Sequence, residues 1–147
     1  MAGRRTAAAI AATLGLVVAG CGSSGSNGGP PTKQAYLKEA TAICAAAGKK
    51  LDAATKSLAK GTDATTFVKG SVLPILRDDL LGKLRALTPP KGDEATVAAI
   101  IAAGDRGVAA LEKSPASLLS GKGASHDGFA KLGQLATAYG LNCGGTG

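Results

Sequence analysis

Residues 33–60 carry one continuous apolar stripe with the spacing of an α-helix, and this stripe constrains the fold more than any other feature. Its members recur at intervals of three and four residues: Leu37, Ala40, Cys44, Ala47, Leu51, Ala54 and Leu58. Such intervals place these side chains on one helix face. Thr32, after two prolines, is a suitable N-cap, and Gly61 is expected to end the helix. The stripe therefore predicts a helix whose buried face includes the thiol of Cys44.

A second and a third helix are bounded by recognisable start and stop signals. Asp63 is expected to cap the second helix, and Pro74 is expected to kink or break it. Asp93 is expected to cap the third helix, which Ser114-Pro115 ends before a short turn through Leu118 and Leu119. The apolar residues expected to face inward from these two helices are Phe67, Leu73, Leu76, Leu80, Leu84, Leu87, Val97, Ile100, Ile101, Val108 and Leu111. Gly104, on the same face as the last of these, is expected to let a neighbouring helix approach closely.

A fourth helix follows the glycine-rich connection at residues 121–123. Ser125 or Asp127 is expected to cap it, and Gly140 is expected to end it in a left-handed conformation, with Leu141 packing back. Its inward side chains are expected to be Phe129, Leu132, Leu135, Ala136 and Tyr139. Because no segment shows the alternation of a strand, the predicted fold class is all-α, a bundle of about four helices over residues 33–147.

The N-terminus has the plan of an export signal. A cationic start, Met1 to Arg5, precedes 14 apolar residues from Thr6 to Ala19. A membrane-spanning helix needs ~20 residues, so the stretch fits the apolar region of a secretory signal peptide. Arg4-Arg5 leaves the twin-arginine route open, although the weakly hydrophobic residues that follow favour general secretion.

Val18, Ala19, Gly20 and Cys21 complete this segment: an aliphatic residue, two small residues and a cysteine. The stretch resembles the lipobox of bacterial lipoproteins. The resemblance implies that Cys21 receives a diacylglycerol thioether and that cleavage occurs between Gly20 and Cys21. Two acyl chains give stable membrane anchoring. The mature chain is then expected at the extracytoplasmic face of the cell membrane.

The expected organisation has three parts. Residues 1–20 are the signal peptide, residues 21–32 are the lipidated cysteine and a tether, and residues 33–147 are the helical domain. The tether sequence GSSGSNGGPP is rich in Gly and Ser, which is typical of a flexible coil. It is expected to hold the domain away from the membrane.

The chain has three cysteines, and lipidation of Cys21 leaves Cys44 and Cys143 as an even pair. Exported proteins meet oxidising conditions, so a disulfide between the two is expected. Free thiols or a metal site are the alternatives, but a metal site needs further ligands and the chain has one His and no CxxC motif. The predicted bundle is therefore cross-linked by one disulfide.

Three stretches, YLKEATAICAAAGKKL, ALTPP and AYGLNC, are similar to those of small helical lipoproteins from actinobacterial envelopes. The resemblance supports the same fold and compartment. It implies no catalytic residues, because such domains have no agreed biochemical activity.

No motif predicts catalysis, a metal or a cofactor. Ser125-His126-Asp127 has the letters of a triad, but triads are assembled from separated segments. Asp78-Asp79 is interpreted as a solvated face, since adjacent helix positions point about 100° apart. The stretch around Lys122 lacks the spacing and context of a phosphate loop. A net charge of +7 without basic residues interleaved with aromatics argues against nucleic acid as a partner.

The sequence leaves three functions open. The first is a non-enzymatic binding or structural module at the outer face of the membrane, with an envelope protein, wall polymer or lipid as partner. The second is a carrier of a small apolar ligand in a cavity between helices, which a deep apolar pocket would favour. The third, an enzyme, would need a cleft with convergent polar groups near Asp78, Asp79 or His126. We expect the first.

Overall fold

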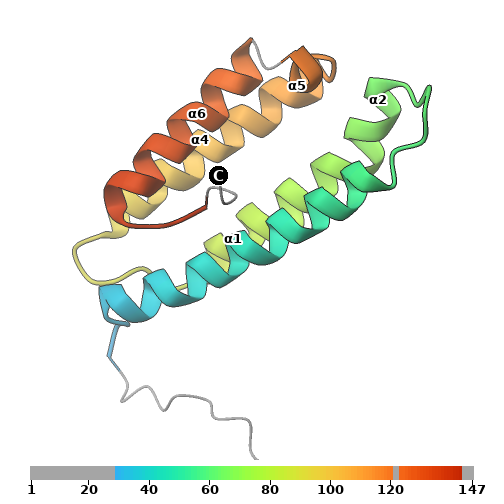
Figure 1. Cartoon of the computed structure of the whole chain (residues 1–147). Helices are drawn as coiled ribbons and strands as arrows, with labels where there is room; N and C mark the ends of the chain where they lie inside the picture. The colour runs from blue at the N-terminus through green and yellow to red at the C-terminus, as the bar shows by residue number, and fades with distance from the viewer. Residues whose placement is uncertain (1–28, 121–122, 144–147) are drawn as a thin grey trace, which may run out of the picture.

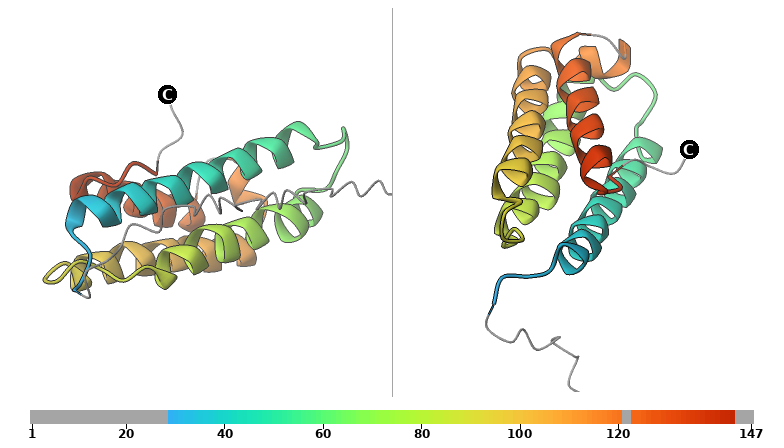
Figure 2. Two further views of the ribbon diagram at one scale, coloured as in Figure 1. Left: turned by 90° about the horizontal axis from the view of Figure 1, so that it is seen from below. Right: turned by 90° about the vertical axis from the view of Figure 1, so that its left-hand side faces the viewer.

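The computed structural model describes residues 29–120 and 123–143, and the chain forms helices and no strand within these ranges. The elements in chain order are α1 (Lys33–Lys56), α2 (Ala64–Phe67), η1 (Val68–Val72), η2 (Ile75–Gly82), α3 (Lys83–Ala86), α4 (Glu94–Lys113), α5 (Ser117–Ser120) and α6 (Ala124–Tyr139). Figures 1 and 2 show two helical hairpins: α1 lies along the continuous stretch from α2 to α3, and α4 lies along α6. The predicted all-α bundle is confirmed.

The predicted disulfide between Cys44 and Cys143 is also confirmed. It joins the middle of α1 to the segment that follows α6, with the two Cα atoms 4.9 Å apart and a sequence separation of 99 between the partners. The predicted signal peptide, the lipidation site at Cys21 and most of the tether lie outside the described residues.

Two predicted N-caps form as expected. The Thr32 hydroxyl accepts a hydrogen bond from the N–H of Ala35 at 3.2 Å, and Asp63 Oδ2 accepts one from the N–H of Thr66 at 3.0 Å. Each bond satisfies one of the amide groups that a helix start leaves without an intrahelical partner. These short polar residues therefore fix where α1 and α2 begin.

The end of α1 differs from the prediction. The helix ends at Lys56, with Ser57 as C-cap, and not at Gly61. Two hydroxyls bond back to carbonyls of the last turns, Thr55 to Leu51 and Ser57 to Ala54, each at 2.9 Å. Such back-bonding competes with the helical ladder. Gly61, with a φ of 85°, shapes the connection to α2 instead.

The predicted kink or break at Pro74 does not take the form of a break. The chain stays helical from Ala64 to Ala86, with π-helical segments η1 and η2 on either side of the proline. In a π-turn each N–H bonds five residues back, as Leu73 does to the Val68 carbonyl. We attribute the continuity to these wider turns, which make room for a ring that would clash within an α-helix.

The start of α6 also differs from the prediction. Its N-cap is Gly123, with a φ of 95°, so neither Ser125 nor Asp127 caps it. The helix begins at Ala124 because Gly123 has a positive φ, a backbone conformation that glycine adopts without strain. The other end is as predicted: Gly140 is left-handed, and the N–H of Leu141 bonds to the Ala136 carbonyl at 2.8 Å.

Glycines bring α4 very close to two neighbours. A Cβ atom on Gly104 would lie 2.5 Å from a Leu81 methyl group, which confirms the predicted close approach at this residue. A contact between backbones joins α4 to α6, where a Cβ on Gly128 would lie 2.5 Å from Gly107 Cα. Here backbone packs on backbone, so α4 and α6 form one tightly joined wall of the bundle.

Candidate functional site: an apolar cavity between α1 and α6

A cavity of about 630 Å³, partly open to solvent, lies between the second half of α1, the stretch from α2 to η2, and α6. Its lining residues are Leu51, Thr55, Leu58, Phe67, Val72, Leu76, Leu80, Leu118, Phe129, Leu132, Gly133, Ala136, Thr137 and Cys143. None of them is charged, and the side-chain hydroxyls are those of two threonines. The cavity is therefore an apolar space along the bundle axis.

Small residues on α6 keep this space open. Gly133 and Ala136 line the cavity, and a Cβ atom placed on Gly133 would have no neighbour within 4 Å. On the opposite wall, Leu51 is only partly buried although it belongs to the predicted apolar stripe of α1. The two helices thus face each other across a gap that their side chains do not fill.

Two leucines mark the rim of the cavity. Leu58, just after α1, is 37% exposed, and Leu118 of α5 is 38% exposed. Among the residues whose burial the structure describes, which leave out 119–122, 124 and 125, they are the exposed large hydrophobic residues, and both line the cavity. Figure 1 shows that the end of α1 and the short helix α5 lie toward the same end of the bundle as α2. Exposed apolar surface is therefore gathered at this end of the cavity.

A tyrosine cluster closes the opposite end of the bundle. The rings of Tyr36 and Tyr139 meet edge to face with centroids 6.2 Å apart, and Lys33 Nζ lies 4.2 Å from the centroid of the Tyr139 ring. The Tyr139 hydroxyl donates to Asp93 Oδ2 at 2.8 Å. Burial, and then this bond, raise the pKa of Tyr139, and burial raises the pKa of Tyr36. Both phenols are neutral at physiological pH.

This cluster corrects the predicted role of Asp93. The residue does occupy the N-cap position of α4, but its side chain makes no capping bond there and accepts from Tyr139 instead. Glu94 reaches back to the N–H of Gly92 at 2.8 Å. Asp93 therefore joins the start of α4 to the end of α6.

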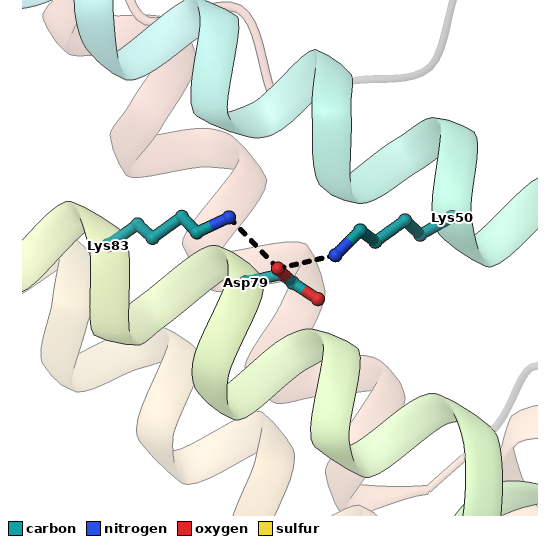
Figure 3. A network of polar contacts seen from close by, with 3 residues as sticks. All are labelled: Lys50, Asp79 and Lys83. Carbon is teal, nitrogen blue, oxygen red and sulfur yellow. Dashed lines mark hydrogen bonds and ion pairs between the residues drawn. The ribbon is translucent and has the colours of Figure 1, made fainter.

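The acidic pair in η2 is not brought together as a site. Asp79 Oδ1 lies 2.7 Å from Lys50 Nζ of α1 and 2.9 Å from Lys83 Nζ, and Figure 3 shows the carboxylate between the two ammonium groups. Hydrogen bonds from Lys50 and then Lys83 lower the pKa of Asp79. Asp78 is exposed. Asp79 thus acts as a charged cross-link between α1 and η2.

His126 and Asp127, two residues of the triad-like stretch, do not line the cavity. His126 and Asp127 are both exposed in the first turn of α6, with His126 Nδ1 3.7 Å from Asp127 Oδ1. Within the described part of the chain, no group of three or more His, Cys, Asp or Glu side chains is placed to hold a metal ion. In the same part of the chain, no helix combines the length and hydrophobicity needed to cross a membrane.

Comparison of the chain with protein-family models, with curated proteins and with solved structures finds no match. The geometry of the cavity is thus the main guide to function. The sequence alone leaves an inter-helix cavity open as an alternative and does not locate it. The available signal was the set of small residues on one face of α6, Gly133, Ala136 and Thr137.

Proposed function

We propose that this protein is a lipid-anchored lipoprotein of the bacterial envelope whose helical domain binds a small apolar ligand in the cavity between α1 and α6. The observation that carries the proposal is the cavity itself, with a volume of about 630 Å³ and no charged lining residue. Sites for small ligands usually occupy ~300–1,000 Å³ and have mostly apolar walls. A role as a purely structural module would not require this space.

The exposed rim supports the same proposal. Each Å² of apolar surface removed from water contributes about 25 cal/mol, so a ligand that covers Leu58 and Leu118 gains affinity from both. Isolated exposed leucines are ordinary on a protein surface. Two that border one apolar cavity are better explained by an occupant of that cavity.

Filling the cavity should abolish ligand binding without unfolding the domain. The probe is the neutral fluorophore N-phenyl-1-naphthylamine, titrated into the full chain carrying Cys21→Ser, exported and purified with the Cys44–Cys143 bond formed. Gly133→Phe should weaken binding at least tenfold and Gly133→Leu less, because the new side chains enter space that is open in the wild type. The measurement is the fluorescence titration.

Ala138→Leu is the matched control for this experiment. Ala138 is exposed on α6 and does not line the cavity, so probe affinity should stay within twofold of the wild type. Circular dichroism should show the same helix content in all variants. Equal probe binding by Gly133→Phe and the wild type would contradict the proposed site.

The anchor is tested separately from the cavity. Intact mass of the wild-type protein from the membrane fraction should fit a chain that begins at Cys21 and carries diacylglycerol. Cys21→Ser should release the protein from that fraction, because the thioether cannot form. A wild-type chain of unmodified mass would contradict the lipoprotein part of the proposal and leave the cavity part unaffected.

A further inference from the structure

A second hollow adjoins the cavity at its leucine-bearing end. It measures about 320 Å³, and Leu58 and Phe67 line both spaces. The hollow carries four side-chain hydroxyls, those of Ser57, Thr62, Thr66 and Ser71, and the larger cavity carries the two of Thr55 and Thr137. The apolar cavity thus continues, across two shared side chains, into a smaller hollow with a larger polar share.

Three lysines are sequence neighbours of residues that line this hollow. Lys56, Lys60 and Lys69 are each one residue away from a lining residue of the hollow, and all three are exposed. None of them makes an ion pair with another described residue, whereas Lys50 and Lys83 are held by Asp79. The acidic residue in the same stretch is Asp63, whose carboxylate accepts from the N–H of Thr66 as the cap of α2. The segment that lines the hollow, residues 54–71, therefore carries three lysines and one aspartate.

We propose that the ligand is a single-chain amphiphile with an anionic head, whose tail fills the apolar cavity and whose head occupies the hydroxyl-lined hollow. This inference rests on the proposed function and adds the chemical class of the ligand. The match is one of polarity: an uncharged space takes the hydrocarbon, and the flanking ammonium groups supply charge-assisted hydrogen bonds to a carboxylate or phosphate. Such bonds are roughly twice as strong as neutral ones.

The test varies the head while keeping the tail constant. Laurate, dodecanol and dodecyltrimethylammonium compete with N-phenyl-1-naphthylamine on the full chain carrying Cys21→Ser, below the concentrations at which they form micelles. Laurate should bind severalfold more tightly than dodecanol and at least tenfold more tightly than the cation. Lauroyl-lysophosphatidylglycerol, added as a fourth ligand, distinguishes a lipid headgroup from a free fatty acid as the source of the anion.

Two triple variants with the same net charge distinguish an effect of the lysines beside the hollow from an effect of the protein's overall positive charge. Lys56→Gln/Lys60→Gln/Lys69→Gln should remove the preference for laurate over dodecanol and leave dodecanol affinity unchanged. Lys38→Gln/Lys49→Gln/Lys91→Gln, at exposed positions that border neither space, should keep the preference. Equal loss of the preference in both variants would overturn the inference.

The outcomes also separate this inference from the proposed function. Laurate, dodecanol and dodecyltrimethylammonium could bind equally while Gly133→Phe still abolishes binding. The preference for an anionic head would then be wrong, and the apolar site would stand. If the naphthylamine binds but no amphiphile displaces it, the amphiphile class is wrong. If neither the naphthylamine nor an amphiphile binds, both proposals fail.

Discussion

Replacing both disulfide cysteines, as Cys44→Ala/Cys143→Ala, should lower the free energy of unfolding by about 2–5 kcal/mol. The bond closes a loop across a sequence separation of 99, for which chain entropy alone gives ~4.7 kcal/mol. A domain of this size commonly has only ~5–15 kcal/mol in total. The effect should therefore be visible as a large drop in the urea midpoint, measured by circular dichroism on oxidised wild type and on the variant.

The wild type after reduction provides the control for this measurement. Reduced wild type and the double variant should unfold at similar urea concentrations, because both lack the cross-link. A change below about 1 kcal/mol in the variant would contradict a role for the bond in constraining the unfolded chain. Alkylation before and after reduction should find two thiols only after reduction.

Two glycine-to-alanine substitutions in α6 should have opposite effects on stability. In Gly128→Ala the new Cβ would lie 2.5 Å from Gly107 Cα and 2.7 Å from Gly107 N. Backbone atoms cannot rotate away, so α4 and α6 must separate, and the cost should be about 1–3 kcal/mol. In Gly133→Ala the Cβ meets nothing within 4 Å. The gain in helix propensity should then stabilise the domain by about 0.5–1 kcal/mol.

Equilibrium urea unfolding of the two variants beside the wild type measures both effects. Each variant is the other's control, because both replace a glycine with an alanine in the same helix and differ only in what the methyl group meets. Stabilisation by Gly128→Ala would show that the close contact between α4 and α6 does not exist in solution.

The sequence predicts the helices better than it predicts every residue that they bury. The caps at Thr32 and Asp63 depend on neighbouring residues, and both are confirmed. In the second helix, a period of 3.6 residues points to Leu80 as an inward residue, and Leu80 does pack against both buried clusters. Leu81, which the pattern leaves out, is nevertheless fully buried. It lies in the π-helical segment η2, which no local pattern reveals.

The candidate site was less predictable than the fold because it depends on distances between helices. The apolar stripe of α1 predicts that Leu51 and Leu58 face a core, yet Leu58 follows the helix and is exposed at the cavity rim. The position of Gly104 on the inward face of its helix is enough to predict a close contact with a neighbouring helix. The pairing of Gly107 with Gly128 requires knowing which helix lies against which.

The position of the disulfide divides α1 into halves with different surroundings. Cys44 lies midway along the 24 residues of the helix. The half before it packs at the tyrosine cluster, and the half after it borders the cavity and is tied to η2 by the ion pair of Lys50 with Asp79. The disulfide therefore joins the end of α6 to α1 at the point where the well-packed end of the bundle gives way to the cavity.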